Sequence, residues 1–451
     1  ARRELTTPYA APRSKVERLV ADMWRAILEI DTVGVHDRFF ELGGTSLQAA
    51  RFVNELQTEL GESIFVVTLF AAPSVAEYAT FLQEQYPAAV ARLVGRDHAL
   101  VRPASSTAVI SAADVARLRA AVPIADAIVA ENGDKNPPAI FILSPPRSGT
   151  TLLRIMLAGH RDLFSASELQ LLGFSTLRER AAAYTGRFSP WLDGAIRTAM
   201  EVEGLGADDA KALLQTLASN GLTTKALYRR IQEAVRPRIL VDKSPSYALD
   251  PSALRRAEVD FDGALYVHLV RHPVPMIESF ERHHMDQILY LHEHPYGPRQ
   301  LAELVWTVSH QNILDFLSEV PRERWFRLQF EQLVTDPAAE MEALCSRFGL
   351  SFDPAVIQPY EQVDAKMVDG VYPESAPMGD PGFLAHGRID PSTAATVLRS
   401  GQSLPLGAPT REVAAIFGYD LPVNGSHDRR IGRDALARQR ELRRSGSRSN
   451  G

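Results

Sequence analysis

The 451-residue chain is long enough for two to four domains, and its apolar and charged fractions are those of an ordinary globular protein. A net charge of -6 and a pI of about 6.1 argue against a nucleic-acid-binding protein. The single cysteine, Cys345, excludes a disulfide framework, and we expect it to be structural. Because the sequence contains no long uncharged apolar stretch, we expect a cytoplasmic protein with no membrane or nucleic-acid partner.

A small helical domain is predicted over residues 14–86, after a linker of residues 1–13 that has no hydrophobic period. Ser14 and Glu17 have the spacing of a capping box, and apolar residues then recur with helical periodicity, so we expect an all-α, four-helix unit. The run GGTSL puts Ser46 at the start of a helix, where the helix dipole favours a negatively charged group such as a phosphodiester. A plain helix N-cap is the alternative role for this serine.

The run DRFFELGGTSL, residues 37–47, resembles the carrier proteins of nonribosomal peptide and polyketide assembly lines. In that family the serine carries 4′-phosphopantetheine, so the resemblance implies attachment of this group at Ser46. Thr45 stands where many carriers have aspartate, and threonine is common there in the peptidyl type. The resemblance also implies an acyl or peptidyl group tethered to the carrier, and upstream and downstream assembly-line domains as partners.

Residues 87–137 are predicted to be a linker with one short helix, from Ser111 to Ala121, that docks on the next domain. Such a linker would give a tethered group the freedom to reach an active site. A second domain is predicted over residues 138–424. It is followed by a polar, Arg-rich tail, residues 425–451, which we expect to be exposed.

An anion-binding loop is the central feature of the second domain. Residues 139–143 predict a buried strand, and a Pro/Ser/Gly turn then leads into a helical pattern. Backbone N–H groups at a helix N-terminus bind phosphate or sulfate, and polar side chains add donors. The residues expected to form this cradle are Arg147, Ser148, Gly149, Thr150 and Thr151. The loop lacks the lysine of an NTPase P-loop, and an ordinary strand–helix turn is the alternative.

Three further buried strands are predicted, alternating with helices, around residues 238–242, 264–270 and 325–330. This order predicts an α/β fold with a parallel, doubly wound sheet. Ligands of such sheets bind beyond the carboxyl ends of the strands. We therefore expect one cleft at which the polar loops after three of the strands converge, namely residues 144–151, 242–247 and 271–273.

The run PRSGTT, residues 146–151, resembles the loop with which sulfotransferases hold the 5′-phosphosulfate of PAPS (3′-phosphoadenosine-5′-phosphosulfate). The run LVRHP, with Ser279 eight residues after Arg271, resembles their 3′-phosphate element. These resemblances imply a P-loop-like sulfotransferase fold with PAPS as donor, and Arg271 and Ser279 on its 3′-phosphate. Residues 379–388 resemble the late loop that sulfotransferases fold over the donor, which implies a 3′-phosphate contact for Arg388.

Sulfuryl transfer needs cations around the phosphosulfate and a base near the acceptor hydroxyl. Lys243 resembles a lysine that contacts the bridging oxygen in tyrosylprotein sulfotransferases, and Glu168, 21 residues after Arg147, resembles their catalytic base. The alternatives are a surface lysine and a glutamate that favours a helix N-terminus. Cytosolic sulfotransferases use a histidine base instead, so His310 is a second candidate. The histidines have no metal-binding spacing, and we expect no metal site.

A carrier followed by a sulfotransferase resembles the didomain of polyketide assembly lines that make terminal alkenes, with matching runs at residues 242–251 and 306–312. The resemblance implies sulfation of the β-hydroxyl of an acyl chain tethered to Ser46. One alternative is a carrier joined to a non-catalytic, nucleotide-binding docking module. A nucleotide kinase is a further alternative, but the loop lysine and a clear Mg²⁺ carboxylate are absent from the sequence.

Overall fold

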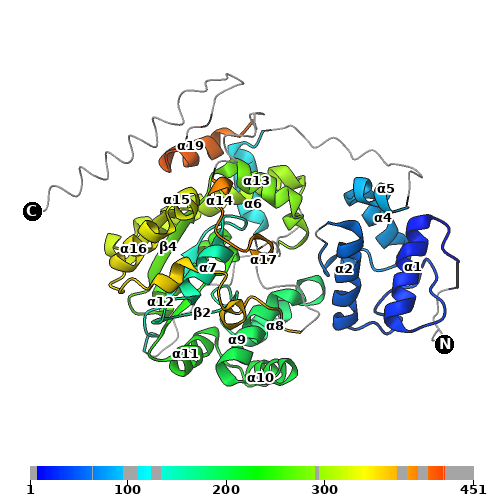
Figure 1. Ribbon diagram of the computed structural model, residues 1–451, viewed down its shortest axis with the longest axis horizontal. Coiled ribbons are helices and arrows are strands. Elements are labelled where there is room, and N and C mark those ends of the chain that lie inside the picture. The colour runs from blue at the N-terminus through cyan, green and yellow to red at the C-terminus, as the bar shows by residue number, and fades with distance from the viewer. Residues whose placement is uncertain are drawn as a thin grey trace, which may run out of the picture.

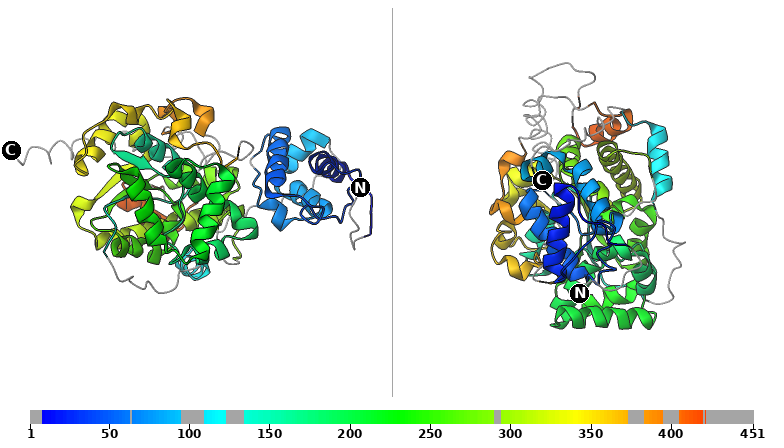
Figure 2. Two further views of the ribbon diagram at one scale, coloured as in Figure 1. Left: turned by 90° about the horizontal axis from the view of Figure 1, so that it is seen from below. Right: turned by 90° about the vertical axis from the view of Figure 1, so that its right-hand side faces the viewer.

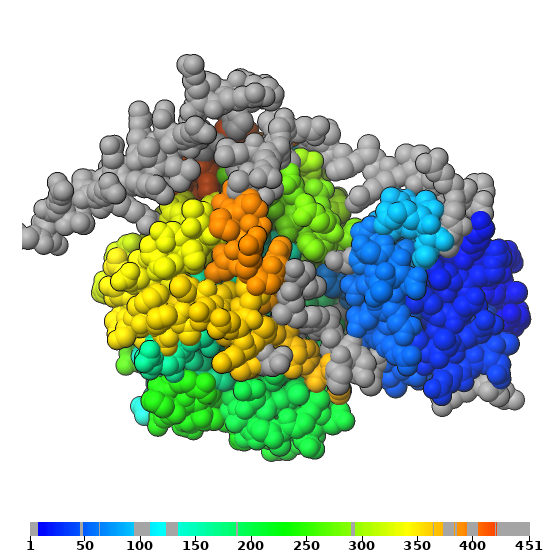
Figure 3. Space-filling view, in the orientation of Figure 1, coloured from blue at the N-terminus to red at the C-terminus, as the bar shows by residue number. Residues whose placement is uncertain are grey.

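In the computed structural model of the chain, the described residues are 8–62, 64–94, 109–122, 134–289, 294–372, 383–394, 405–419 and 421. They form a small helical unit near the N-terminus and a larger α/β unit (Figure 1). The space-filling view shows these units as two lobes that lie side by side (Figure 3). The predicted polar tail lies outside the described residues.

The helical unit is a bundle around an aromatic core. Ser14 caps the first helix and forms the predicted capping box with Glu17. The Trp24 ring is fully buried, with its centroid 5.1 Å from that of Phe39 and 6.0 Å from that of Phe52. Burial of such large rings is a main source of stability in a unit this small. Its helices are α1 (Lys15–Leu28), α2 (Ser46–Leu60), α3 (Thr68–Ala71), α4 (Val75–Gln85) and α5 (Pro87–Val94).

Helix α5 lies beyond the end predicted for this unit. Ala89 and Val90 are buried in the same core as Trp24, so the helical unit reaches Val94 rather than residue 86. Pro87 is the reason the boundary is misplaced. A proline is compatible with the first position of a new helix, where no intrahelical N–H is needed, and here it begins α5 instead of a linker.

A parallel sheet of five strands, in the order β2-β3-β1-β4-β5, forms the centre of the α/β unit. The predicted α/β class and parallel sheet are confirmed. The strands are β1 (Ile140–Leu143), β2 (Leu163–Ser165), β3 (Ile239–Asp242), β4 (Leu265–Val270) and β5 (Trp325–Gln329). Strand β2 was not predicted, because three residues are too few to show a hydrophobic period.

Helices cover both faces of the sheet, as in other doubly wound folds (Figures 1 and 2). The helices are α6 (Ala112–Ala121), α7 (Thr150–Ala158), α8 (Leu177–Ala183), α9 (Asp193–Glu203), α10 (Ala207–Ser219), α11 (Thr224–Val235), α12 (Pro251–Asp260), α13 (Pro273–Arg282), α14 (Pro298–Ser318), α15 (Phe330–Thr335), α16 (Pro337–Arg347), α17 (Phe383–His386) and α19 (Ala408–Ile416). Short 3-10 helices connect them, at η1 (Gly186–Leu192), η2 (Pro245–Leu249), η3 (Met285–Gln287), η4 (Arg322–Arg324), η5 (Pro354–Ile357), η6 (Val363–Lys366) and η7 (Pro391–Thr393).

The side chains of β1 alternate between the two layers. Phe141 and Leu143 pack with α11, α12 and α14, whereas Ile140 and Ile142 pack with α7, α15 and α16. All four are buried, as expected for a central strand of a parallel sheet. The loop after β1 is therefore anchored from both sides.

Helix α6, which the sequence places within the predicted linker, packs on the α/β unit. Leu118 is fully buried in a cluster shared with α13, α14 and α19. The guanidinium of Arg119 donates to the side chains of Asn312 and Gln311 on α14. Among the described residues, the helices are all too short or too polar to cross a membrane.

Candidate active site

The loop between β1 and α7 is held in a conformation that exposes anion-binding groups. Arg147 has a φ of +62° and Gly149 a φ of +89°. A β-carbon on Gly149 would lie 2.2 Å from the ring of Phe330, so only glycine fits there. The Ser148 side chain is fully buried, and its hydroxyl has no hydrogen-bond partner among the described residues. A buried hydroxyl next to the N-terminus of α7 fits a phosphate ligand.

Three of the predicted loops follow neighbouring strands. Strand β1 pairs with β3 through Phe141 and Asp242, and with β4 through Leu143 and His268. Because the three strands are parallel, their carboxyl ends lie at one edge of the sheet. The loops that carry Arg147, Lys243 and Arg271 therefore leave the same edge of the sheet.

Hydrogen bonds join the loop after β1 to the loop and helix after β4. The Nε of Arg147 donates to the Ser279 hydroxyl over 3.1 Å, and Nη1 of Arg271 donates to the Arg147 carbonyl over 2.7 Å. The guanidinium of Arg271 also lies over the Phe330 ring, 4.5 Å from its centroid. The two segments that resemble the 5′- and 3′-phosphate elements are thus in direct contact.

Lys243 and Glu168 form an ion pair at the same edge of the sheet. Nζ of Lys243 contacts Oε1 of Glu168. The lysine side chain is 1% exposed and the glutamate side chain 28% exposed, so one side of the pair faces solvent. A buried ammonium next to an accessible carboxylate can supply both a cation for a leaving group and a base for an incoming hydroxyl.

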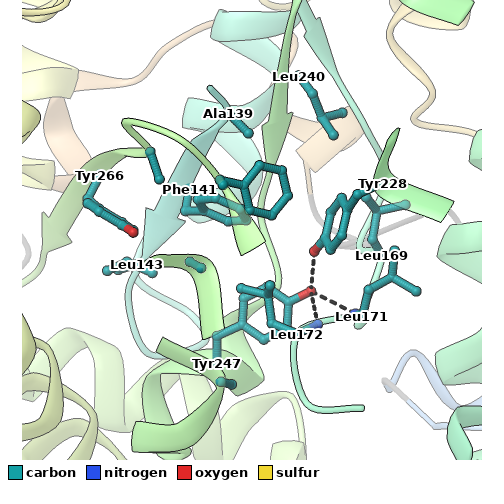
Figure 4. Close-up of a cluster of buried hydrophobic side chains, with 14 of the residues drawn as sticks. Ala139, Phe141, Leu143, Leu169, Leu171, Leu172, Tyr228, Leu240, Tyr247 and Tyr266 are labelled. Carbon is teal, nitrogen blue, oxygen red and sulfur yellow. Dashed lines mark hydrogen bonds between the residues drawn. The ribbon is translucent and has the colours of Figure 1, made fainter. Parts of the chain in front are cut away.

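A buried network of hydroxyl groups positions the segment after Glu168. The Tyr247 hydroxyl donates to Asp242 over 2.9 Å and accepts from the N–H of Leu171 over 2.8 Å. Tyr228 donates to the same carboxylate, and Figure 4 shows its hydroxyl beside that of Tyr247. Burial raises the pKa of Asp242 to about 6, and the hydrogen bonds that it accepts limit the rise.

The backbone around Glu168 is held by two further residues. Arg180 is buried, and it donates to the carbonyls of Leu169 and Gln170 over 2.9 and 3.1 Å. Gly194, at the start of α9, lies so close that a β-carbon would be 1.9 Å from the Glu168 carbonyl. The backbone that carries the Glu168 side chain is therefore fixed by contacts on several sides.

His310 and Arg388 do not join this group in the structure. His310 is fully buried on α14, hydrogen-bonded to His268 over 3.0 Å and packed against Trp306 and Phe417. Burial, with a contribution from the positive charge of Arg327, lowers the pKa of His310 to about 3. A base must reach its substrate, so this position does not suit His310 for that role. Arg388 is exposed after α17.

The predicted attachment site lies at the first residue of α2. Thr45 caps this helix by accepting from the N–H of Gln48. The turn before it needs glycine, because Gly43 has a φ of +95° and a β-carbon on Gly44 would lie 2.4 Å from the Phe39 ring. Ser46 is thus at a helix N-terminus, which fits a phosphodiester-linked group.

Sequence reasoning missed the residues that hold the site in place: Arg180, Gly194, Tyr228 and Gln170. Nothing in the sequence around Arg180 or Gly194 distinguishes them from surface residues of a helix. Tyr247 falls in the run 242–251 that supported the family resemblance, and that run was the only signal for the network. In the described part of the chain, no group of three His, Cys, Asp or Glu side chains could hold a metal ion.

An anion-binding loop and a Lys–Glu pair at the carboxyl edge of a parallel sheet fit an enzyme that transfers a charged group. Residues 138–354 match the sulfotransferase family, and residues 18–82 match the phosphopantetheine attachment site. The chain is 42% identical to the sulfotransferase domain from the curacin biosynthetic pathway, over 64% of this chain and 100% of that one, with a TM-score of 0.58. The chain therefore belongs to the sulfotransferase family, and it also contains a carrier unit.

A second solved relative is the sulfotransferase domain of the Synechococcus PCC 7002 olefin synthase. It is 36% identical over 65% of this chain and 99% of that one, with a TM-score of 0.58. The carrier unit is 45% identical over 76 residues to tyrocidine synthase 3 of Brevibacillus parabrevis and 44% identical over 77 residues to malpinin synthetase of Mortierella alpina. The chain spans 1% of the length of these two synthetases, and each match covers 17% of this chain.

We predict that Gly149→Ala weakens donor binding. The added methyl group would collide with Phe330, and alanine disfavours a φ of +89° by roughly 1–2 kcal/mol. Calorimetric titration with 3′-phosphoadenosine-5′-phosphate should show an affinity loss of at least about ten-fold. Gly263→Ala is the matched control, since its φ is +67° with open space around it. Equal binding by both variants would contradict the role of this close contact.

We predict that the free energy of unfolding falls in acid because of the buried His272. Its Nδ1 accepts from the Val274 N–H at the start of α13, which requires a neutral ring. Burial, and then the charge of Arg271, lower its pKa from 6.5 to about 4. The folded state therefore gains stability above pH 6.5 and loses it as pH falls towards 4. The difference of about 2.5 between the ordinary pKa and the folded-state pKa corresponds to at most about 3.4 kcal/mol of stability.

The measurement is urea unfolding of the wild type and of His272→Asn at pH 7, 5.5 and 4. Asparagine can also cap a helix but does not titrate, so the variant should lose less stability between pH 7 and 4. An identical pH dependence in the two proteins would show that another group is responsible.

Proposed function

We propose that the chain is a PAPS-dependent sulfotransferase that transfers a sulfuryl group to the β-hydroxyl of an acyl chain, held by 4′-phosphopantetheine on Ser46, in a natural-product assembly line. The observation that carries this proposal is the arrangement at one edge of the sheet. Arg147, Lys243 and Arg271 follow three neighbouring parallel strands, and Glu168 is paired with the lysine.

The loop after β1 is proposed to bind the 5′-phosphosulfate of the donor. Arg147 supplies positive charge, and the buried hydroxyl of Ser148 and the hydroxyls of Thr150 and Thr151 supply donors at the N-terminus of α7. Arg271 and Ser279 are proposed to bind the 3′-phosphate. The contacts of Arg147 with both of these residues support a single donor site that spans the two loops.

The chemical step is proposed to be an in-line transfer. The acceptor oxygen forms a bond to sulfur while the bond from sulfur to the 5′-phosphate oxygen breaks. The hydroxyl proton moves to the Glu168 carboxylate, and the electron pair of the broken bond stays on the phosphate. Lys243 stabilises the charge that develops on this leaving oxygen. The ion pair keeps the two side chains together, which supports a role for Glu168 at the acceptor hydroxyl and for Lys243 at the leaving oxygen of the same reaction.

An acyl substrate on the chain's own carrier is supported by the domain order and by the relatives. The two solved sulfotransferase domains come from the curacin pathway and from an olefin synthase. The carrier unit is similar to parts of peptide synthetases. A tethered hydroxy-aminoacyl group is therefore a second substrate to test in the assay. Phosphopantetheine supplies the flexible thiol to which the substrate is attached, and Ser46 at the N-terminus of α2 holds it.

The experiment loads the carrier with β-hydroxyacyl-pantetheine, adds PAPS, and weighs the intact protein. We expect the mass of one sulfonate on the wild type, and turnover about 10²–10³-fold slower in Arg147→Ala and Lys243→Ala, because each removes a group that stabilises developing charge. Release of donor product without a mass change in the protein, or binding without turnover, would contradict transfer to the tethered chain.

We further predict that Glu168→Gln lowers kcat by about 10²–10⁴-fold with little effect on donor affinity, because glutamine cannot accept the proton. Glu233→Gln, an exposed glutamate on α11, is the matched control and should retain full activity. His310→Gln should affect stability more than turnover per folded molecule. A larger loss of kcat in His310→Gln than in Glu168→Gln would assign the base to the histidine.

A further inference from the structure

One aromatic residue of the carrier core also contacts the α/β unit. Tyr86 follows α4, and its ring centroid lies 4.6 Å from that of His284. Tyr86 is 3% exposed and His284 7% exposed. Burial raises the pKa of the tyrosine hydroxyl, which therefore stays protonated, and the side chain of Gln287 is its polar neighbour. The contact is thus a ring pair with one polar side chain beside it.

A second contact lies beside the first. Helix α3 of the carrier unit packs against η1 of the α/β unit. The indole nitrogen of Trp191, in η1, donates over 3.1 Å to the carbonyl of Ile288, directly after η3. This bond joins η1 and η3 into one continuous surface, which we call the η1/η3 surface. The carrier therefore touches a single patch at two points.

The η1/η3 surface is adjacent to the segment that carries Glu168. Arg180 donates to the Trp191 carbonyl and, with the same nitrogen, to the Leu169 carbonyl, each over 2.9 Å. Helix α9, which begins directly after η1, places Gly194 against the Glu168 carbonyl. A carrier bound to η1 thus contacts an element that is directly linked to the backbone around Glu168.

The orientation of the carrier agrees with this position. Helix α2, which begins at Ser46, is on the side of the helical unit that faces the α/β unit in two perpendicular views (Figures 1 and 2). The contacts described are a ring pair, a neighbouring polar side chain and one short helix. Small contacts of this kind are typical of transient interfaces, and a carrier has to leave after each reaction.

We propose that the η1/η3 surface is the docking site for this chain's own carrier unit, recognised through Tyr86 and α3, and that docking there delivers the tethered substrate to the Lys243–Glu168 pair. The docking contact between the two units does not depend on the reaction that the enzyme catalyses. Its role in substrate delivery, in contrast, rests on the proposed function. Two measurements separate these two statements.

The test variant is His284→Asn with Gln287→Ala, in the full chain. Asparagine tolerates the φ of +48° at position 284 and removes the ring, and alanine removes the polar neighbour of Tyr86. His36→Asn, an exposed histidine of the carrier unit, is the matched control. None of these residues belongs to the proposed donor site or to the Lys243–Glu168 pair.

The first measurement is amide hydrogen exchange of the full chain without donor or acyl group. We expect exchange in α3 and η1 to increase in the double variant and to stay unchanged in His36→Asn. Unchanged exchange in the double variant would overturn the docking site. This measurement does not depend on sulfuryl transfer, so an increase supports the docking site even if the wild type proves to be inactive.

The second measurement compares single-turnover rates on tethered β-hydroxyacyl-carrier and on free β-hydroxyacyl-pantetheine. Loss of docking should slow the tethered reaction by at least about ten-fold and change the free reaction by less than about two-fold. An equal loss on both substrates would overturn the proposal, because His284 and Gln287 would then act on the chemistry itself. An unchanged tethered rate would also overturn it.

Discussion

The ammonium of Lys243 is the charge around which the catalytic edge of the sheet is arranged. A lysine that is 1% exposed must have a negatively charged partner, since an unpaired buried charge is strongly destabilising. Glu168 is that partner, and its backbone is held by Gly194 and by the carbonyl contacts of Arg180. The ion pair therefore needs the folding of β2, β3, α8 and α9 around it.

Unusual backbone geometry gathers around the same edge. Arg147 and Gln170 both have positive φ values, of +62° and +53°, although neither is a glycine. Such conformations are unfavourable in isolation and persist only where surrounding contacts enforce them. Arg271 holds the first residue through its carbonyl, and Arg180 and Ser244 hold the second. Strain of this kind at two loops of one edge is typical of a preorganised binding site.

The sequence allowed the sheet, the anion loop and the carrier to be predicted, because each depends on local signals. Apolar runs that end in polar loops identified β1, β3 and β4, and the capping box of Ser14 identified α1. The contacts that fix Glu168 could not be predicted, because they join residues far apart in the chain. Arg180 resembles a surface residue of a helix in the sequence, but the fold buries it against the backbone of Leu169 and Trp191.

The same reason explains what the sequence did not show about His310 and about the end of the carrier unit. The choice of His310 relied on residue type and sequence context, and neither reveals that Trp306 and Phe417 enclose the ring. The boundary at residue 86 was wrong because the packing of Ala89 and Val90 on the carrier core is a tertiary effect. Burial of a polar or charged side chain is decided by the whole fold, and periodicity within one segment carries little information about it.

The division of the inter-domain region between the two units has a practical consequence for recombining assembly lines. Helix α5 belongs to the carrier core, and α6 is bound through Leu118 and Arg119 to the sulfotransferase unit. A chimaera joined at residue 86 or 137 would strip one unit of a packed helix. A splice site that keeps Val94 with the carrier and Ile110 with the sulfotransferase unit leaves both hydrophobic cores whole, so it is the junction at which foreign carriers can be grafted onto this enzyme.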